Sequence, residues 1–240
     1  MNINIKLVDE LEHLVNEILA DRPTHGLGRS LRALKKELSI YKSHSGKGIH
    51  VFTGKVDKLQ IGGGKHTLPG FLNIDIFEPA DLIFDIREGI PLESTSVNFI
   101  FSEHFMEHID YPKSTKFFIS ECFRILNTDG QIVIGVPDTQ KIIKGYMSKD
   151  SALWQTYLNS WYKNRDCLDD FNTYIDLVNY HMRDQDDSEK YNPHFWGYDF
   201  EKLESLLVNA GFKSVRHWEF DSTIANPKRE FGSVYVVATK

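Results

Sequence analysis

The segment Lys58-Leu-Gln-Ile-Gly-Gly-Gly-Lys65 decides the fold, because in it an apolar strand runs directly into three glycines. Consecutive glycines allow positive φ angles and let backbone N–H groups approach a ligand closely. The next apolar strand, residues 71–76, carries Asp75 near its end. A carboxylate at that point can accept two hydrogen bonds from a ribose diol. The glycines and Asp75 together indicate a ligand site. The structural alternatives are a tight turn for the glycines and a turn-forming role for Asp75.

The same segment excludes the fingerprint of nicotinamide-binding proteins. Thr67 stands where the third glycine of G-x-G-x-x-G belongs. Asp75 follows Gly64 by 11 residues, whereas that fingerprint places its acid about 20 residues on, after a full helix. The connector 65–71 is too short for such a helix.

Short apolar runs alternate with helical patterns from residue 49 onward. Helical patterns lie at 112–126, 139–147 and 200–209, and the candidate strands are 58–62, 71–76, 82–86, 97–101, 131–136, 214–220 and 233–239. Strands separated by helices indicate a mostly parallel sheet with helices on both faces. The closing pair of strands, joined by a loop, indicates an antiparallel end. The sequence therefore predicts an α/β fold with a Rossmann-like sheet of seven strands.

Two segments lie outside this alternation. Residues 1–48 hold two amphipathic helices followed by a Ser/Gly/Lys linker, so we expect a helical N-terminal appendage before the main domain, 49–240. Residues 151–198 contain 11 aromatic side chains in 48 positions, and we expect a helical insertion there. Its aromatic side chains can form a small local core or a lid over a substrate pocket, and both can hold.

Composition is that of an ordinary globular protein, with 240 residues, 41% of them hydrophobic and 26% charged. The net charge of -6 disfavours a nucleic-acid-binding protein, although residues 29–65 carry 9 basic against 2 acidic side chains, which suits a phosphorylated partner. Only Cys122 and Cys167 occur, which excludes a disulfide scaffold. No apolar run has the length of a membrane span, and the acidic N-terminus is unlike a signal peptide. We therefore expect a soluble, cytoplasmic protein.

Six motifs follow one another in a recognisable order: Leu59-Gln-Ile-Gly-Gly-Gly64, Pro69-Gly-Phe-Leu-Asn-Ile-Asp75, Asp85 to Leu92, Ser102-Glu-His-Phe-Met-Glu-His108, Glu121-Cys-Phe-Arg-Ile-Leu126 and Gly135-Val-Pro-Asp138. The series resembles the class I S-adenosylmethionine-dependent methyltransferases. It is most similar to their bacterial branch associated with surface-polysaccharide and sugar modification. The resemblance covers residues 58–240, and the aromatic insertion matches least. Gln60 departs from the family, which usually has an acid or Asn there.

The resemblance implies a binding site for S-adenosylmethionine, with S-adenosylhomocysteine as the product. Gln60 would accept a hydrogen bond from the methionine amino group. Ser102 and Glu103 would close the pocket near the methyl group. The methionyl part would be lined by Gly62, Gly63 and Gly64.

The adenosine part of the cofactor would meet the next two strand ends. Asp75 would hold the ribose, and Ile76 would pack on the adenine. Asp85 and Ile86 would meet the adenine edge, where a carboxylate can accept from the exocyclic amino group. Taken alone, Asp85 is more simply a turn-forming residue.

Methyl transfer to an oxygen also needs a base for the acceptor's proton. His104 lies nearest to the strand end and is the first candidate, while Asp138 and His194 are the others. His108 is expected to be structural. We predict no metal site, because His104-Phe-Met-Glu-His108 does not match His-Glu-x-x-His and the chain has no cysteine pairs.

The sequence thus predicts an enzyme that transfers a methyl group from S-adenosylmethionine to a hydroxyl of a sugar, sugar nucleotide or glycan precursor, in a role such as polysaccharide biosynthesis. An N-methyltransferase of another small molecule is an alternative. A second alternative is a non-catalytic, methyltransferase-like binding subunit. The N-terminal helices could form a homodimer or cover the pocket.

Overall fold

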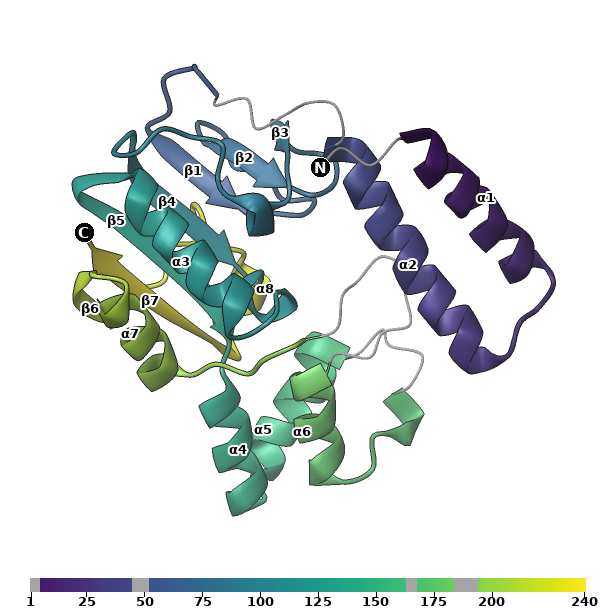
Figure 1. The fold of residues 1–240 in the computed structure, drawn as a ribbon. Helices are drawn as coiled ribbons and strands as arrows, with labels where there is room; N and C mark the ends of the chain where they lie inside the picture. The colour runs from purple at the N-terminus through teal and green to yellow at the C-terminus, as the bar shows by residue number, and fades with distance from the viewer. Residues whose placement is uncertain (1–4, 45–51, 163–167, 184–193) are drawn as a thin grey trace.

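The computed structural model describes residues 5–44, 52–162, 168–183 and 194–240, which build a sheet of seven strands with helices around it (Figure 1). The strands are β1 (Lys58–Ile61), β2 (Leu72–Asp75), β3 (Leu82–Ile83), β4 (Val97–Glu103), β5 (Leu126–Pro137), β6 (Lys213–His217) and β7 (Ser233–Thr239). Their order across the sheet is β3-β2-β1-β4-β5-β7-β6. Strands β1 to β5 are parallel, and β7 is antiparallel to β5 and β6. The predicted Rossmann-like, mostly parallel sheet is confirmed.

The direction of the strand order reverses between β1 and β4. From β1 the chain moves outward to β2 and β3, then returns to place β4 on the other side of β1. Ile61 and Ser102 are register partners near the carboxyl ends of these two strands. In open α/β sheets the ligand crevice lies outside such a switch point. The loops after β1 and β4 are therefore in the position where a site is expected.

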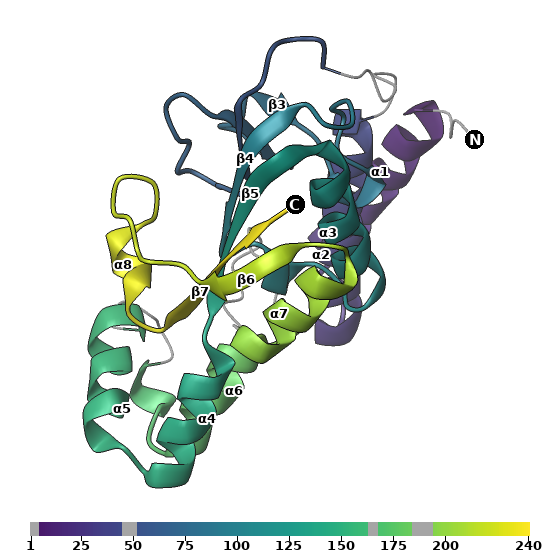
Figure 2. The same ribbon diagram turned by 90° about the vertical axis from the view of Figure 1, so that its left-hand side faces the viewer.

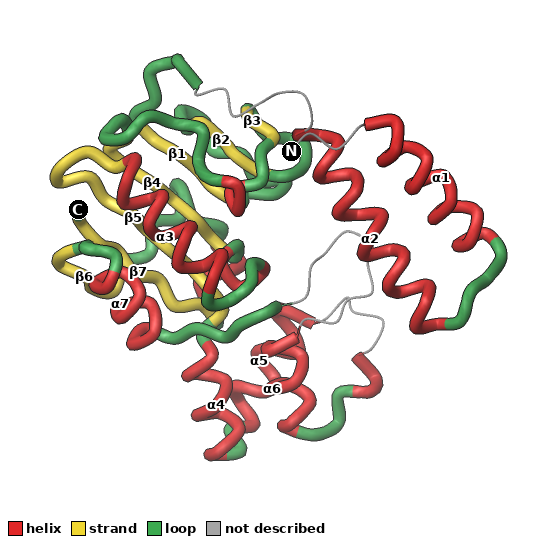
Figure 3. The backbone as a smooth tube through the Cα atoms, in the orientation of Figure 1, coloured by secondary structure: helices red, strands yellow, loops and turns green. Residues whose placement is uncertain are grey.

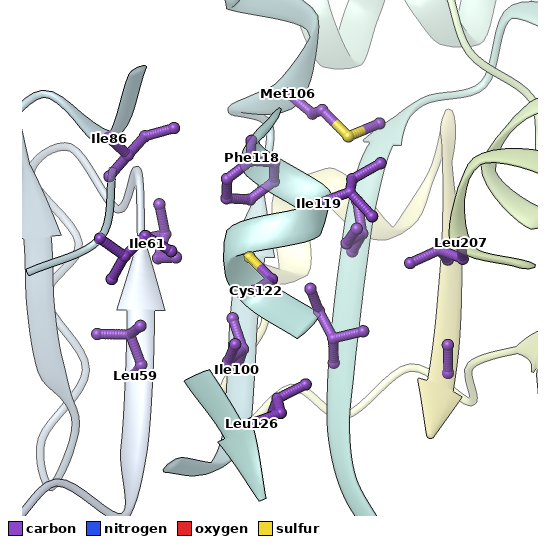
Figure 4. Close-up of a cluster of buried hydrophobic side chains, with 14 of the residues drawn as sticks. Leu59, Ile61, Ile86, Ile100, Met106, Phe118, Ile119, Cys122, Leu126 and Leu207 are labelled. Carbon is purple, nitrogen blue, oxygen red and sulfur yellow. The ribbon is translucent and has the colours of Figure 1, made fainter. Parts of the chain in front are cut away.

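Helices α3 (Lys113–Ile125) and α7 (Phe200–Asn209) cover one face of the sheet (Figure 2). The apolar side chains of α3 recur at three- and four-residue spacing, so they form one stripe that the sheet buries. Each fully buried side chain of this kind contributes roughly 1.5–3 kcal/mol. This core includes Leu59, Ile61, Ile100, Met106, Phe118, Ile119, Cys122, Leu126 and Leu207 (Figure 4).

The opposite face of the sheet is covered by loops and by the short helix α8 (Pro227–Glu230), which lies on the other side from α3 and α7 (Figure 2). A second apolar cluster fills the space beneath them. It joins Phe101 and Tyr235 to Leu68, Phe71, Trp218 and Phe220.

The predicted strand 82–86 is shorter than expected. β3 ends at Ile83, and Asp85 instead caps a 3₁₀ turn, Ile86–Glu88, through a hydrogen bond from the backbone N–H of Arg87. A side-chain cap competes with the strand ladder for the backbone, which is how a carboxylate ends an apolar run.

Helices α1 (Ile5–Ala20) and α2 (His25–His44) form a hairpin that projects beside β2 and β3 (Figures 1 and 3). Lys42 on α2 joins Asp9 and Glu12 on α1 at 2.7 and 2.8 Å. Glu37 reaches Arg87 of the sheet domain at 3.3 Å. The helical N-terminus is confirmed, and residues 45–48 of the predicted linker lie outside the described ranges.

The insertion forms a helical bundle beyond the carboxyl end of β5 (Figure 1). Its elements are α5 (Ser151–Tyr157), a π-helical turn (Leu158–Tyr162), a 3₁₀ turn (Leu168–Asp170) and α6 (Tyr174–Arg183), and they pack with the preceding helix α4 (Thr139–Ser148). Ile142, Tyr157, Leu177 and Tyr180 form a core of their own there, so one of the two interpretations of the aromatic residues, a local core, is correct. Residues 163–167 and 184–193 lie outside the description. Within the described ranges no helix is long and apolar enough to cross a membrane.

Candidate functional site

Residues Gly62, Gly63 and Gly64, called the glycine turn here, follow β1 directly and leave their backbone accessible. Gly62 and Gly64 take φ angles of +69° and +57°, a region that favours glycine. The Gly64 N–H donates to Asp75 Oδ2 at 2.9 Å, which joins the end of β1 to the end of β2. A Cβ added at Gly64 would meet no atom within 4 Å, so the backbone at this point is open to a ligand.

Phe105 links the glycine turn to the end of β4. Its ring lies directly on Gly62, where any Cβ would overlap it. The ring also meets Phe118 of α3 edge-on, with 5.4 Å between the centroids. The loops on both sides of the switch point are therefore packed against each other.

Asp75 keeps capacity for a ligand. Its Oδ1 accepts from the Phe77 N–H at 3.2 Å and its Oδ2 from Gly64. A carboxylate can accept about four hydrogen bonds, and the half-buried Asp75 therefore has room for a diol. The neighbouring Ile76 is half-buried as well.

The Gln60 side chain forms hydrogen bonds within the protein, in the loop after β1. Its amide nitrogen donates to the His66 carbonyl at 2.7 Å, and its oxygen accepts from the Leu68 N–H at 2.8 Å. A Cβ on Gly63 would collide with this amide. Gln60 thus shapes the loop after β1, and Gly63 gives it the space.

Asp85 and Ile86 are also engaged within the protein. Asp85 is 6% exposed, and its carboxylate accepts from the Arg87 guanidinium at distances of 2.6 to 3.0 Å. The hydrogen bond that Arg87 donates to Asp85 raises the pKa of Arg87 further. Ile86 lies in the apolar core under α3. Both residues follow β3, in which Ile83 is the register partner of Asp75 at the end of β2.

Glu103 faces the side of the sheet that carries α8. Its carboxylate accepts from the Tyr235 hydroxyl at 2.7 Å, from Arg229 at 3.1 Å and from the Asn226 N–H at 3.2 Å. The adjacent Ser102 is buried, and among the described residues its hydroxyl has no hydrogen-bond partner. Of the two, only Ser102 is a remaining candidate for a ligand at the switch point.

His104 follows β4 immediately and has a φ angle of +53°. Its Nε2 lies 2.7 Å from Ser233 Oγ, and its Nδ1 lies 3.5 Å from Glu107 Oε1. The ring stacks on Trp161 of the insertion, with 5.3 Å between the centroids. Burial, reinforced by the charge of Arg229, lowers the pKa of His104 well below its ordinary value, so the imidazole is neutral near pH 7.

The other two predicted bases have different settings. Asp138 caps α4, accepting from the Lys141 N–H at 3.0 Å. His194 donates from Nδ1 to the His181 carbonyl at 2.7 Å and meets the His108 ring edge-on at 4.9 Å. The structure thus brings His104, His108 and His194 together and leaves Asp138 as a helix cap.

Two residues of this cluster are not singled out by the sequence pattern. Glu107 is 1% exposed and lies between His104 and His108, and Trp161 covers the His104 ring. The spacing of Glu107 three residues after His104 is a local signal that could have found the first. Trp161 comes from the insertion, and no local pattern ties it to β4.

A cavity of about 500 Å³ lies elsewhere. It is lined by residues 67–71 and 78–81 together with Asn73. None of the residues predicted to bind the cofactor lines it. The switch point is the better candidate for the functional site, because the open glycine backbone and Asp75 lie there.

No protein-family model and no curated protein matches this chain. Solved structures that it resembles include an S-adenosylmethionine-dependent methyltransferase of Thermotoga maritima described as a possible histamine N-methyltransferase, with 17% identity over 79% of this chain and 84% of that chain and a TM-score of 0.43. Another, from Archaeoglobus fulgidus, shows 17% identity over 87% and 94%, with a TM-score of 0.43. A third, from Methanosarcina mazei, shows 15% identity over 79% and 94%, with a TM-score of 0.49. At these identities and TM-scores the likeness transfers no activity, so the residues of the site must carry any functional conclusion.

Proposed function

We propose that this chain is a methyltransferase that binds S-adenosylmethionine at the glycine turn after β1 and releases S-adenosylhomocysteine. The observation that carries the proposal is the Gly64–Asp75 pair at the switch point of the sheet. The exposed backbone at Gly64 suits the polar amino-acid end of such a ligand. The Asp75 carboxylate, which can accept further hydrogen bonds, suits a ribose diol. Of the residues considered for the cofactor, the proposal keeps Gly62, Gly63, Gly64, Asp75, Ile76 and Ser102.

The reaction would be an in-line displacement. A lone pair of the acceptor attacks the methyl carbon, the C–S bond breaks and its electrons return to sulfur, and the acceptor loses its proton. The protein must chiefly hold the acceptor in line with the methyl group. We keep His104, which directly follows β4, as the proposed base that takes the proton; its contact with Ser233 Oγ, 2.7 Å from Nε2, would have to open to admit the acceptor. Its neighbour Glu107 would stabilise the imidazolium that forms.

The insertion supplies a cover for this site. Trp161 stacks on His104 and its indole N–H donates to the Phe231 carbonyl at 3.0 Å, so the insertion is fixed over the end of β4. Two exposed aromatic residues, Phe195 and Trp196, follow His194 directly in the chain. Their side chains are 53% and 43% exposed. Such rings favour stacking against a sugar-like face. We therefore propose a hydroxyl of a sugar, sugar nucleotide or glycan precursor as the acceptor, in the cytoplasm.

A binding experiment tests the proposal. Calorimetric titration of the full chain with S-adenosylmethionine should show saturable binding to one site. The variant Asp75→Ala removes two hydrogen bonds to a charged acceptor, each about 1.5–3 kcal/mol, so affinity should fall by about a hundredfold or more. Asp57→Ala is the matched control, because Asp57 is an exposed acid at the other end of β1. Absence of binding by the natural chain would refute the proposal.

The same titration decides an alternative. Gln60, Asp85 and Glu103 are all engaged in contacts within the protein, and this favours a methyltransferase-like subunit that binds a partner without a cofactor. That alternative predicts no response to S-adenosylmethionine, whereas the methyltransferase requires one.

The N-terminal hairpin offers a surface for self-association. Apolar side chains on α1 at positions 7, 11, 14 and 18 repeat at four- and three-residue spacing, while Val8 and Val15 are buried. These four exposed residues, defined here as the α1 stripe, are Leu7, Leu11, Leu14 and Ile18. A stripe of this spacing suits packing against a second helix, so we propose a homodimer through α1.

A further inference from the structure

We propose that Glu107, His108 and His194 form a binding site for one divalent first-row transition ion. The first two lie on the 3₁₀ turn Met106–His108 after β4, and His194 precedes α7. One carboxylate and two imidazoles are the donor set that Zn²⁺, Co²⁺ and Fe²⁺ accept, whereas Mg²⁺ and Ca²⁺ prefer oxygen alone. The site shares Glu107 with the proposed methyl transfer, in which this residue would stabilise His104, but metal binding itself requires no methyl transfer.

The distances in the cluster suit one ion. A ligand atom from each of the three residues lies within 4.8 Å of the other two. Glu107 Oε1 and His108 Nε2 are 3.9 Å apart. Ligands bound at about 2.0–2.2 Å from one ion lie roughly 3.0–3.5 Å from each other. Side-chain adjustments of less than an ångström per residue would therefore close the three donors around an ion.

The tautomer of His194 is set for coordination. Its Nδ1 lies 2.7 Å from the His181 carbonyl oxygen, which can only accept, so Nδ1 carries the proton. In the neutral ring Nε2 then holds a lone pair. A metal-bound histidine almost always donates its other N–H to a carbonyl or carboxylate in this way.

The backbone fixes the two halves of the site side by side. The Phe195 N–H donates to the Glu107 carbonyl at 2.8 Å, which ties the segment of His194 to the turn after β4. His108 meets His194 edge-on. Ligands that lie 87 residues apart in the chain are thus positioned by the fold and need no large movement.

Burial also favours a cation here. Both carboxylate oxygens of Glu107 are buried, so the carboxylate lies in a region of low dielectric constant, where its attraction to a cation is strong. His108 and His194 are only half-buried, so an ion can reach the cluster from solvent. Three protein ligands would leave a further position for water or another oxygen donor.

Cobalt provides a direct test, because Co²⁺ bound by imidazole and carboxylate absorbs visible light. The full chain, freed of metal by a chelator, should bind one Co²⁺ with a visible absorption band and one Zn²⁺ in calorimetry. His194→Ala and Glu107→Gln should each weaken binding by about tenfold or more. His13→Ala is the control, since His13 is an exposed histidine on α1.

Thermal unfolding with and without Zn²⁺ provides a second measurement, which also shows whether each variant is folded. Zn²⁺ should raise the Tm of the natural chain and of His13→Ala, because an ion that binds only the folded state stabilises it. It should leave the Tm of His194→Ala unchanged. Since His194 is half-buried, this variant should fold even if Glu107→Gln does not. An absence of Co²⁺ absorption by the natural chain, or equal affinity in His194→Ala, would overturn the proposal.

Discussion

Gly62, Gly64 and His104 all take positive φ angles, at +69°, +57° and +53°, and all three border the switch point of the sheet. Two are glycines, which adopt this conformation without strain. His104 adopts the same left-handed conformation although it has a β-carbon, so its backbone is strained. Strained residues of this kind are concentrated at functional sites. At this scale the candidate site is formed by local backbone geometry, and Asp75 supplies its carboxyl group.

The two glycines should respond differently to the same substitution. Gly64→Ala meets open space and should cost only the left-handed strain of about 1–2 kcal/mol. Gly62→Ala must in addition displace the Phe105 ring, which adds about 1–3 kcal/mol of overpacking. Urea unfolding of both variants measures the difference in the free energy of unfolding. Equal destabilisation would mean that Phe105 does not pack on Gly62.

His104 should act on the chemical step. For any acceptor that the natural chain methylates, His104→Ala should lower kcat by about 10²–10⁴-fold, the contribution of a general base. The Kd for S-adenosylmethionine should stay nearly constant, because His104 is assigned to the acceptor. His217→Ala, an exposed histidine on β6, is the control. Natural turnover in His104→Ala would remove this residue as the base.

The sequence predicted the residues whose contacts are local. Gly64 and Asp75 lie 11 residues apart and meet across neighbouring strands, so a strand–turn–strand pattern is sufficient to find them. Glu103 was assigned to the cofactor, yet its partner Tyr235 is 132 residues away. A contact of that separation depends on which strand lies beside which, and one sequence does not contain this information. The grouping of His194 with Glu107 was missed for the same reason.

Elements were predicted best where an apolar stripe is long. The pattern at 112–126 gave α3, which spans Lys113–Ile125, because five buried positions follow the helical period there. The length of the strand at 82–86 was overestimated, because the three apolar residues before Asp85 cannot distinguish a strand from a capped turn. Helix α3 is docked to the segment before β4 by a charged network. Glu121 accepts from the Ile90 N–H at 2.8 Å, and Arg124 donates to the Leu92 carbonyl at 2.8 Å.

This network predicts a pH-dependent loss of stability. The hydrogen bond from Arg124 lowers the pKa of Glu121 below its ordinary value of 4.5. A carboxyl group whose pKa is lowered in the folded state stabilises it above the ordinary pKa, and this stabilisation is lost as the pH falls below 4.5. Glu121→Gln should therefore reduce the free energy of unfolding at pH 7 by about 1.5–3 kcal/mol.

Urea unfolding at neutral and acidic pH provides the measurement. The difference between the natural chain and Glu121→Gln should shrink as the pH falls through the acidic range. Glu93→Gln is the matched control, because Glu93 is an exposed acid in the same segment. A difference that is constant with pH would mean that the charge of Glu121 does not contribute.

At the scale of the whole molecule, the chain joins a sheet domain to a helical hairpin and a helical insertion (Figure 1). The sheet and the two additions follow from composition and periodicity, which are properties of long segments. The positions of the additions do not, because they depend on contacts such as Glu37 with Arg87 and Trp161 with His104.

Self-association can be tested on the α1 stripe. The natural chain should elute as a dimer in size-exclusion chromatography with light scattering. Leu14→Glu should give a monomer, because it places a charge in the centre of the apolar stripe. His13→Glu makes a similar change at the neighbouring, exposed position and should remain dimeric. A monomeric natural chain would show that α1 does not mediate a dimer.

The location of ligand binding tests the central claim most directly. Hydrogen–deuterium exchange of the full chain should be compared with and without S-adenosylhomocysteine at saturating concentration. We predict slower exchange in peptides that cover residues 61–77, since these hold the glycine turn and Asp75, and no change in α1. Unchanged exchange in 61–77, or protection confined to another part of the chain, would contradict the claim that the switch point binds the cofactor.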